Sequence, residues 1–237
     1  AFFRRFAAGA APGGGGAGAG AGGWAHQVVI PVGSVGMNTV LPFSDCDVAV
    51  LGIHKPSTYL PHLVSCLEGQ GAKVRVVGGG SASRGALVPV IKARFGPGRP
   101  PLDLQYAQVS TECMKALLPT DRNSTDVSTD FGDGDPEVAP LVPLSSQLKR
   151  TLLIEAEVVA TASGCNVWSS PGAIVMEGVV DAVCLEECAK VKDQLTTFRR
   201  LSRLVKLWAS RAGVYGTTYA YPGGFAWSVL VLAFLES

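Results

Sequence analysis

The sequence predicts an α+β protein in which a mixed α/β unit is followed by a helical unit. Three features of the chain predict this class. Short segments rich in β-forming residues alternate with turns over residues 24–108, a stretch rich in Asp, Ser, Thr, Pro and Gly follows, and helical spacing dominates from Ser145 onward. With 237 residues, 47% of them apolar, the chain can bury a sizeable core.

The first unit is preceded by a Gly/Ala tract over residues 1–23, which cannot bury enough surface to fold and is predicted to be a flexible lead-in. Within 24–108 we expect one helix at 59–70, because apolar residues recur at helical spacing from Leu60 to Leu67. The expected strands are 26–32, 46–53, 73–77, 87–95 and 102–107.

The second unit follows an acidic linker predicted over residues 109–147. It occupies residues 148–237, and its expected helices are 148–161, 174–192, 195–212 and 227–235. On the helix at 195–212, one predicted face is apolar and consists of Phe198, Leu201, Val205, Trp208 and Ala212. A second face carries a cationic stripe of Arg199, Arg203 and Lys206.

The charges are unevenly distributed, although the formal net charge is only +1 and 16% of residues are charged. No acidic residue lies between Glu68 and Asp103, a region with six Lys and Arg, and a second basic run covers 199–211. Six acids between Asp121 and Glu137 restore the balance. The total charge therefore shows no overall basic field, whereas the positions predict two local basic segments.

The six cysteines are scattered through the chain and are predicted to be reduced core thiols. Cys184 and Cys188 are close enough for zinc, but no second ligand pair follows, so a helical Cys pair is favoured. No apolar run approaches the ~20 residues that span a bilayer, so we expect a soluble protein without a membrane partner.

A set of three acidic residues carries the predicted chemistry. Asp45 and Asp47 are two apart on a predicted strand, so both carboxylates leave one face, about 6–7 Å apart along the backbone. Asp103, in a short apolar strand, is the candidate for a third carboxylate on a neighbouring strand. Three acids without a basic partner repel one another and favour a pair of Mg²⁺ (or Mn²⁺) ions, as polymerases use.

Gly33 and Ser34 precede this motif and fit a phosphate-binding role. A glycine lets backbone amides approach a phosphate closely, and a serine hydroxyl can donate to it. The simpler alternative for the whole motif is a turn with two solvated acids.

The layout Gly33-Ser34, ten residues, Asp45-x-Asp47 and then Leu102-Asp103-Leu104 resembles the polymerase-β-like nucleotidyltransferases. Within that superfamily, LVPVIKARF at 87–95 and LDLQYA at 102–107 are similar to a strand pair of eukaryotic nuclear-type poly(A) polymerases. Similarity to their central helical domain lies in FRRLSRLVKLWA at 198–209, GVY at 213–215 and GGFAW at 223–227. The resemblance covers 28–237 with gaps, and it implies a nucleotidyltransferase palm over 24–108 followed by a helical central domain.

The resemblance also implies roles for individual residues. Asp45, Asp47 and Asp103 match metal-binding carboxylates, and Asp103 is the best candidate for a general base. The positions that match contacts to the incoming nucleotide are Gly33, Ser34, Lys206, Tyr215, Gly223, Gly224 and Phe225. Among these, Ser34 and Lys206 match triphosphate contacts, and Phe225 replaces a valine that lies beside the adenine.

The chain departs from the family at two motifs. Val35-Gly-Met-Asn38 stands where the family has Tyr-Arg-Leu-Gly, and Ser163 replaces an Asn that contacts the nucleotide. The resemblance implies a template-independent enzyme that adds AMP from ATP to RNA 3′ ends. The two departures favour the alternative, a catalytically degenerate module that serves as a structural or RNA-docking subunit of a ribonucleoprotein assembly. A uridylyl or other terminal transferase is a third alternative.

The expected partners are ATP, an RNA 3′ end and other protein subunits that supply RNA binding, because no match to the family's carboxy-terminal RNA-binding domain is found. The resemblance implies a nuclear protein. The Arg-bearing, Ala-rich, acid-free start of the chain is also typical of a transit peptide, which makes the mitochondrion or chloroplast the alternative compartment.

Overall fold

A computed structural model of the chain describes residues 27–78, 88–118, 144–191, 193–216 and 221–237. The flexible lead-in predicted over 1–23 and the acidic stretch 119–143 lie outside the described residues. The described residues contain a strand at each of the five predicted strand positions and a helix at each of the five predicted helix positions, most of them with shifted ends.

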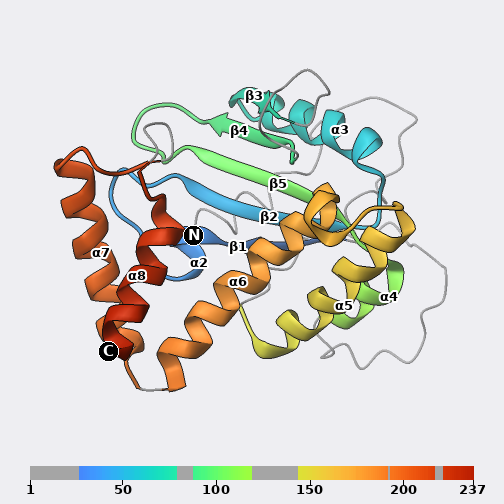
Figure 1. Cartoon of the computed structure of the whole chain (residues 1–237). Helices are drawn as coiled ribbons and strands as arrows, with labels where there is room; N and C mark the ends of the chain where they lie inside the picture. Colours follow the sequence, from blue (N-terminus) through green and yellow to red (C-terminus); the bar gives the residue numbers. More distant parts are fainter. Residues whose placement is uncertain (1–26, 79–87, 119–143, 192, 217–220) are drawn as a thin grey trace.

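One mixed five-stranded sheet forms the centre of the fold, in the order β1-β2-β5-β4-β3 (Figure 1). Its strands are β1 (Gln27–Pro31), β2 (Cys46–Gly52), β3 (Lys73–Val77), β4 (Val90–Arg94) and β5 (Leu102–Gln108). Strands β2 and β5 are parallel, and every other neighbouring pair is antiparallel. Because β2 and β5 lie inside the sheet and are largely buried, their polar residues stand out as candidates for function.

Helix α3 (Pro56–Gly69) covers one face of the sheet. Its buried side chains Tyr59, Leu63 and Leu67 pack against alternate residues of the central strands, such as Val48 and Leu104. The sequence begins this helix with Pro at its first position, where a missing N–H costs nothing.

The opposite face is covered by α5 (Ser146–Ala162), α6 (Pro171–Val191) and the short helix α4 (Thr111–Leu117), with a 3₁₀ turn, η1 (Val167–Ser169), between α5 and α6. One continuous core joins strand residues such as Leu51 and Ala107 to helix residues such as Leu152 and Met176. The first two helices of the predicted helical unit thus pack directly on the sheet, while the boundary at 147/148 stays a prediction.

Helices α7 (Leu195–Arg211) and α8 (Gly224–Glu236) pack against each other, and α8 meets the short helix α2 (Gly33–Gly36) beside β1 (Figure 1). A third core cluster holds them there and consists of Met37, Leu185, Ala189, Phe198, Val231 and Leu232. The α+β class with helices after the sheet is confirmed. None of the helices in the described part of the chain has the length and apolar character needed to cross a membrane.

Helix α4 corrects the linker predicted over 109–147. Its seven residues are too few for a clear apolar period, so the sequence pattern alone does not indicate a helix here. The helix is stabilised from outside by Glu155 of α5, whose buried carboxylate accepts bonds from Ser110 N at 2.5 Å and Ser110 Oγ at 2.8 Å. Ser110 Oγ in turn accepts from Cys113 N at 3.1 Å and caps the helix.

Glu155→Gln should therefore lower the free energy of unfolding by about 2 kcal/mol, because it removes a charged acceptor from two donors at a helix N-terminus. Urea denaturation at neutral pH measures this change. Glu157→Gln, at an exposed position of the same helix, should leave stability nearly unchanged. Equal stability of the two variants would refute the capping role.

Candidate active site

Two carboxylates lie side by side where the two central parallel strands begin. Asp47 and Asp103 are the second residues of β2 and β5, and they are direct partners in the parallel register. By the alternation of strands, their side chains leave the face that also carries Ala49 and Ala107. The structure thus places Asp103 on the strand next to Asp47, as expected from the sequence, while the catalytic role of either stays a prediction.

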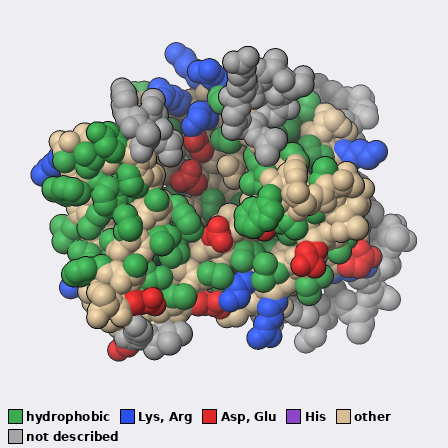
Figure 2. Space-filling view, in the orientation of Figure 1, with side chains coloured by type: hydrophobic (Ala, Val, Ile, Leu, Met, Phe, Trp, Pro, Cys, Tyr) green, Lys and Arg blue, Asp and Glu red, His purple; other side chains and the backbone are tan. Residues whose placement is uncertain are grey.

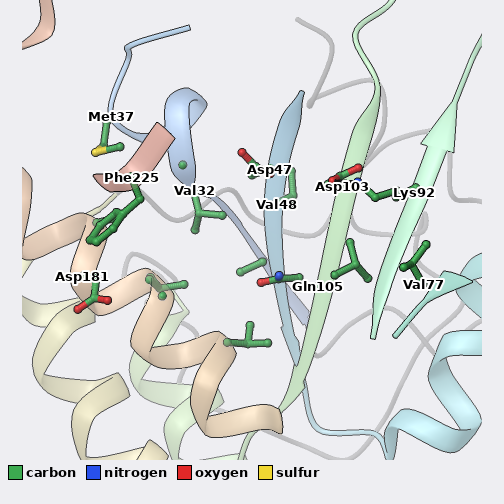
Figure 3. A pocket seen from close by; sticks show the side chains of 17 residues that line it. Val32, Met37, Asp47, Val48, Val77, Lys92, Asp103, Gln105, Asp181 and Phe225 are labelled. Atoms are coloured by element: carbon green, nitrogen blue, oxygen red, sulfur yellow. Dashed lines mark hydrogen bonds and ion pairs between the residues drawn. The ribbon is translucent and has the colours of Figure 1, made fainter. Parts of the chain in front are cut away.

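Asp45 precedes β2 and is exposed. Among the described residues, no three His, Cys, Asp or Glu side chains converge as a group that could hold a metal ion. In Figure 3 the Asp103 carboxylate is directed to Lys92, whereas the Asp47 side chain is directed toward α2. The predicted three-carboxylate metal site is therefore represented here by one adjacent pair and a third acid at its edge.

A cavity of about 360 Å³ opens beside the carboxylate pair (Figure 3). The sheet contributes Asp47, Asp103 and Gln105 to its lining, and α6 contributes a wall of small apolar residues with Asp181. Phe225, in the first turn of α8, adds an aromatic ring to the lining near Asp181 (Figure 3). The cavity thus combines carboxylates with apolar surface and an aromatic ring, a composition typical of small-molecule sites.

The acidic residues influence one another strongly. Burial raises the pKa of Asp47 to about 6, and the charges of Asp103 and Asp45 add to this rise. Lys92 and Lys206 act in the opposite direction and lower the pKa of Asp47. Since repulsion among the three acids raises this pKa, the site favours an added positive charge.

Lys92 corrects the expectation that the three acids have no basic partner. It lies on β4 directly opposite Asp103 in the antiparallel register, and its Nζ donates to Asp103 Oδ2. In the sequence, Lys92 is one of the six basic residues between Glu68 and Asp103, and the register that brings it opposite Asp103 follows from the fold. One oxygen of the best candidate base is therefore engaged by an ammonium group.

Lys206 of α7 is buried, with 2% of its surface exposed, and its Nζ donates to Thr39 Oγ1 at 3.1 Å. Burial lowers its pKa to about 8, and the negative charge of Asp47 acts against this decrease. A buried ammonium group with one neutral partner retains donors for a further acceptor. The structure thus brings Lys206 into the electrostatic field of Asp47.

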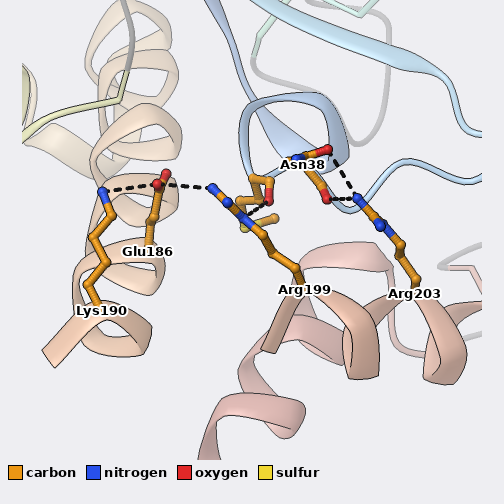
Figure 4. A network of polar contacts seen from close by, with 6 residues as sticks. Asn38, Glu186, Lys190, Arg199 and Arg203 are labelled. Carbon is orange, nitrogen blue, oxygen red and sulfur yellow. Dashed lines mark hydrogen bonds and ion pairs between the residues drawn. The ribbon is translucent and has the colours of Figure 1, made fainter. Parts of the chain in front are cut away.

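The two other cations of the α7 stripe have partners of their own (Figure 4). Arg199 donates to Met37 O at 3.1 Å and to Glu186 Oε1 at 3.2 Å, and Arg203 donates to Asn38 O at 2.5 Å and Asn38 Oδ1 at 3.1 Å. The stripe therefore fixes α7 to the segment that follows α2. Only Lys206 of the stripe lies near the carboxylates.

The buried face of α7 differs from the predicted apolar face. It consists of Phe198, Ser202, Lys206 and Ala209. Trp208, expected to be buried, is 59% exposed and packs edge-on against Trp227, with ring centroids 6.1 Å apart. Relative to the prediction, the helix is rotated about its axis, because Lys206 points inward toward Thr39 and Asp47. Apolar spacing alone does not indicate this inward position of Lys206.

Tyr215 and Gly224 lie on the Lys206 side of the site. A Cβ on Gly224 would lie 2.7 Å from the Tyr215 hydroxyl and 3.8 Å from Cε of Lys206, so glycine is needed for this close packing. Burial, followed by the charges of Asp47 and Asp45, raises the pKa of Tyr215. Gly223 precedes α8 as its N-cap. These residues thus border the carboxylates, although Phe225 alone among the nucleotide-binding candidates of this segment lines the cavity.

Gly33 and Ser34 form the first turn of α2. Ser34 is half-buried, and its carbonyl accepts from Thr39 N at 2.7 Å. Gly33 has a positive φ of 56°, and a Cβ there would lie 2.5 Å from Asp47 Oδ2. The glycine therefore permits the direct approach of the Asp47 carboxylate to the backbone.

Gly33→Ala should destabilise the protein by about 2 kcal/mol, because the left-handed conformation disfavours Ala and the new methyl group displaces the Asp47 carboxylate. Thermal unfolding tests this. Gly178→Ala is the matched control, since Gly178 lines the same cavity from the middle of α6 and a Cβ there meets nothing within 4 Å. The control should be more stable by up to ~1 kcal/mol, and a Gly33 variant that behaves likewise would contradict the packing argument.

Three residues of the site were not identified from the sequence as such. Lys92 and Thr39 are partners of predicted site residues, and Asp181 enters the cavity from α6. In the sequence, Asp181 is a single carboxylate within a mostly apolar stretch of a predicted helix, and this pattern could have indicated a functional residue. The six cysteines are all free, and Cys184 and Cys188 lie one turn apart on α6, as expected for a helical pair.

The helical part of the chain matches a known family of domains. Residues 197–234 match the sequence model of the poly(A) polymerase central domain. This match confirms the resemblance to poly(A) polymerases. Poly(A) polymerase PAPalpha of Candida albicans is 39% identical over 46 residues, which are 19% of this chain and 8% of that protein. Poly(A) polymerase PAPa of the same organism is 37% identical over 46 residues, with the same coverage.

Two solved structures are similar to this chain over most of its length. The Cid1 poly(U) polymerase with Mg and 3′-dATP has a TM-score of 0.45 at 15% identity, covering 89% of this chain and 43% of that one. A cytoplasmic RNA terminal U-transferase has a TM-score of 0.42 at 15% identity, covering 89% of this chain and 41% of that one. The chain thus spans less than half the length of these structures.

Proposed function

We propose that this chain is a template-independent RNA nucleotidyltransferase that adds AMP from ATP to RNA 3′ ends. The observation that carries the proposal is the adjacent pair Asp47 and Asp103 at a cavity, with the buried ammonium group of Lys206 nearby. Paired carboxylates that can bind a metal ion, together with a lysine that can bind phosphate, are suited to phosphoryl transfer. In this reaction, positioning and charge neutralisation supply most of the rate enhancement.

The acidic residues fit a divalent cation. Burial raises the pKa of Asp47, repulsion from Asp103 and Asp45 adds to the rise, and an added positive charge would relieve this repulsion. Carboxylate oxygens are the ligands that Mg²⁺ and Mn²⁺ prefer. Asp45, Asp47 and Asp103 would hold the cation, which when bound supplies charge that stabilises the triphosphate and lowers the pKa of the attacking hydroxyl.

The protein's own groups then have distinct tasks. Asp103 accepts the proton of the RNA 3′-hydroxyl with the carboxylate oxygen that Lys92 leaves available. The hydroxyl oxygen attacks the α-phosphorus of ATP, the new phosphodiester bond forms, and pyrophosphate leaves. Lys206 binds the triphosphate, and the hydroxyl of Ser34, the residue after Gly33, donates to it.

Phe225 is the proposed contact for the base of the nucleotide. It is 46% exposed, lines the cavity and offers a flat apolar surface to a purine, where stacking is worth about 1–3 kcal/mol per base in single-strand complexes. Stacking accepts any base, so the preference for ATP over UTP is the part of the proposal that a comparison of nucleotides tests most directly.

The second candidate function is a degenerate polymerase-like module that serves as a structural or RNA-docking subunit. Two observations favour it. Lys92 already neutralises Asp103, and Arg199 and Arg203 are engaged by Glu186 and by the segment after α2. In this case other protein subunits would provide the catalytic activity.

Isothermal titration with a non-hydrolysable ATP analogue separates the two functions. An enzyme should bind the analogue more tightly with Mg²⁺ than without it, and Asp47→Asn should remove the difference. Binding that is absent, or that is the same with and without Mg²⁺, would contradict the enzyme and favour the scaffold.

A further inference from the structure

The edge hairpin of the sheet carries four cations on one surface. In the antiparallel register of β3 and β4, Lys73 is paired with Arg94 and Arg75 with Lys92. All four residues are exposed. We call this surface the hairpin cationic face. In Figure 2, Lys and Arg side chains gather at the top of the molecule, where β3 and β4 lie, directly above acidic side chains.

The hairpin cationic face belongs to the same side of the sheet as the candidate active site. Lys92 is paired in register with Asp103 and binds its carboxylate, so the two side chains leave the same face. Alternate residues Ile91 and Ala93 point the other way, into the core under α3. Lys92, with Val77 and Val90 beside it, also lines the cavity, so the cations continue its wall outward.

This arrangement is unfavourable for the isolated fold. Like charges directly opposite each other on neighbouring strands are destabilising. Within the described residues, Lys73, Arg75 and Arg94 form no ion pair, and only Lys92 has an acidic partner. Protection of an exposed edge explains charges on β3, which ends the sheet, but not those on β4, which lies between β3 and β5.

We propose that the hairpin cationic face binds the sugar-phosphate backbone of single-stranded RNA and leads its 3′ end into the cavity. Two rows of cations, about 5 Å apart across strands and about 7 Å apart along them, form a track for a chain of phosphates. Lys92 marks the end of the track at Asp103, where the terminal hydroxyl reacts. The proposal rests on the proposed function for its substrate and adds the surface that holds it.

The test is binding of fluorescently labelled oligo(A), measured by anisotropy over a series of salt concentrations without nucleotide or divalent metal. The test variant combines Lys73→Gln, Arg75→Gln and Arg94→Gln and leaves Lys92 intact. The control combines Lys115→Gln, Arg150→Gln and Arg200→Gln, which removes the same charge from exposed positions of α4, α5 and α7.

The hairpin variant should bind at least about tenfold more weakly at low salt, and its slope of log K against log salt should be shallower by about 2. The control should retain most of the affinity and the slope. Arg75→Lys with Arg94→Lys keeps the charges and should bind like the unchanged chain. The hairpin variant should unfold at no lower temperature, because it loses repulsive pairs.

Equal losses in the two triple variants, an unchanged slope, or no RNA binding by the unchanged chain would overturn the proposal. Unchanged RNA binding in the hairpin variant would point instead to an acidic protein surface as the partner of this face. The two proposals fail separately. Charge-dependent RNA binding without nucleotide addition leaves the hairpin track standing and refutes the enzyme, whereas addition of nucleotides with RNA binding independent of the hairpin does the reverse.

Discussion

Asp47→Asn and Asp103→Asn should each lower the rate of nucleotide addition by about a thousandfold, which corresponds to about 4 kcal/mol of transition-state stabilisation. The two carboxylates are neighbours in the parallel register and line the same cavity, so each change removes a negative charge from the place where a cation must bind. Initial rates of primer extension at saturating ATP measure the loss.

Asp181→Asn is the matched control for these variants. Asp181 is a carboxylate of the same cavity, but it lies on α6 and does not belong to the pair on the strands. Its replacement should change the rate by less than about tenfold. If all three variants lose the same activity, or if the Asp47 and Asp103 variants keep theirs, the strand pair is not the catalytic centre.

Lys206→Met should lower nucleotide addition by about a hundredfold and at the same time stabilise the protein. A lysine pKa lowered by burial from 10.5 to about 8 corresponds to a cost of about 3 kcal/mol for the charged form at neutral pH. Met fills a similar volume without charge, and its main penalty is the lost hydrogen bond to the buried Thr39, about 1 kcal/mol. The expected net gain is about 2 kcal/mol in urea denaturation.

The pH dependence of stability gives an independent test of the buried ammonium group. Between pH 8 and 10.5 the unfolded lysine binds a proton that the folded lysine has lost, so stability rises with pH in this window. The difference in unfolding free energy between Lys206→Met and the unchanged chain should therefore shrink from pH 8 to pH 10. Arg200→Met, at an exposed position of α7, should show no such trend, and a constant difference for Lys206 would contradict its burial as a charge.

The sheet could be predicted from the sequence because its strands are short, apolar and separated by turn residues. Cys46–Gly52 and Leu102–Gln108 are of this kind, and their burial follows from the same composition. Helix α4 was missed because seven residues give little periodicity, and part of its stability comes from Glu155, which is distant in sequence. A local sequence pattern does not reveal a stabilising contact with a residue that is distant in the sequence.

For the site as well, the sequence predicts one part and the fold determines the rest. The spacing of Asp45, Asp47 and Asp103 indicated an acidic cluster, but the contact of Lys92 with Asp103 depends on strand order and register. Apolar spacing placed Trp208 inward, whereas Lys206 occupies the buried face at a cost in desolvation. A residue that is unfavourable for folding and is nevertheless buried beside acids is a feature that only the structure reveals.

Primer extension tests the central claim most directly. The chain is incubated with labelled oligo(A), Mg²⁺ or Mn²⁺, and each of the four nucleoside triphosphates in separate reactions, beside the Asp47→Asn variant. The account predicts stepwise extension that requires the metal, is fastest with ATP and is lost in the variant. If the unchanged chain, folded and able to bind the oligonucleotide, extends it with none of the four nucleotides, the chain is not the proposed nucleotidyltransferase.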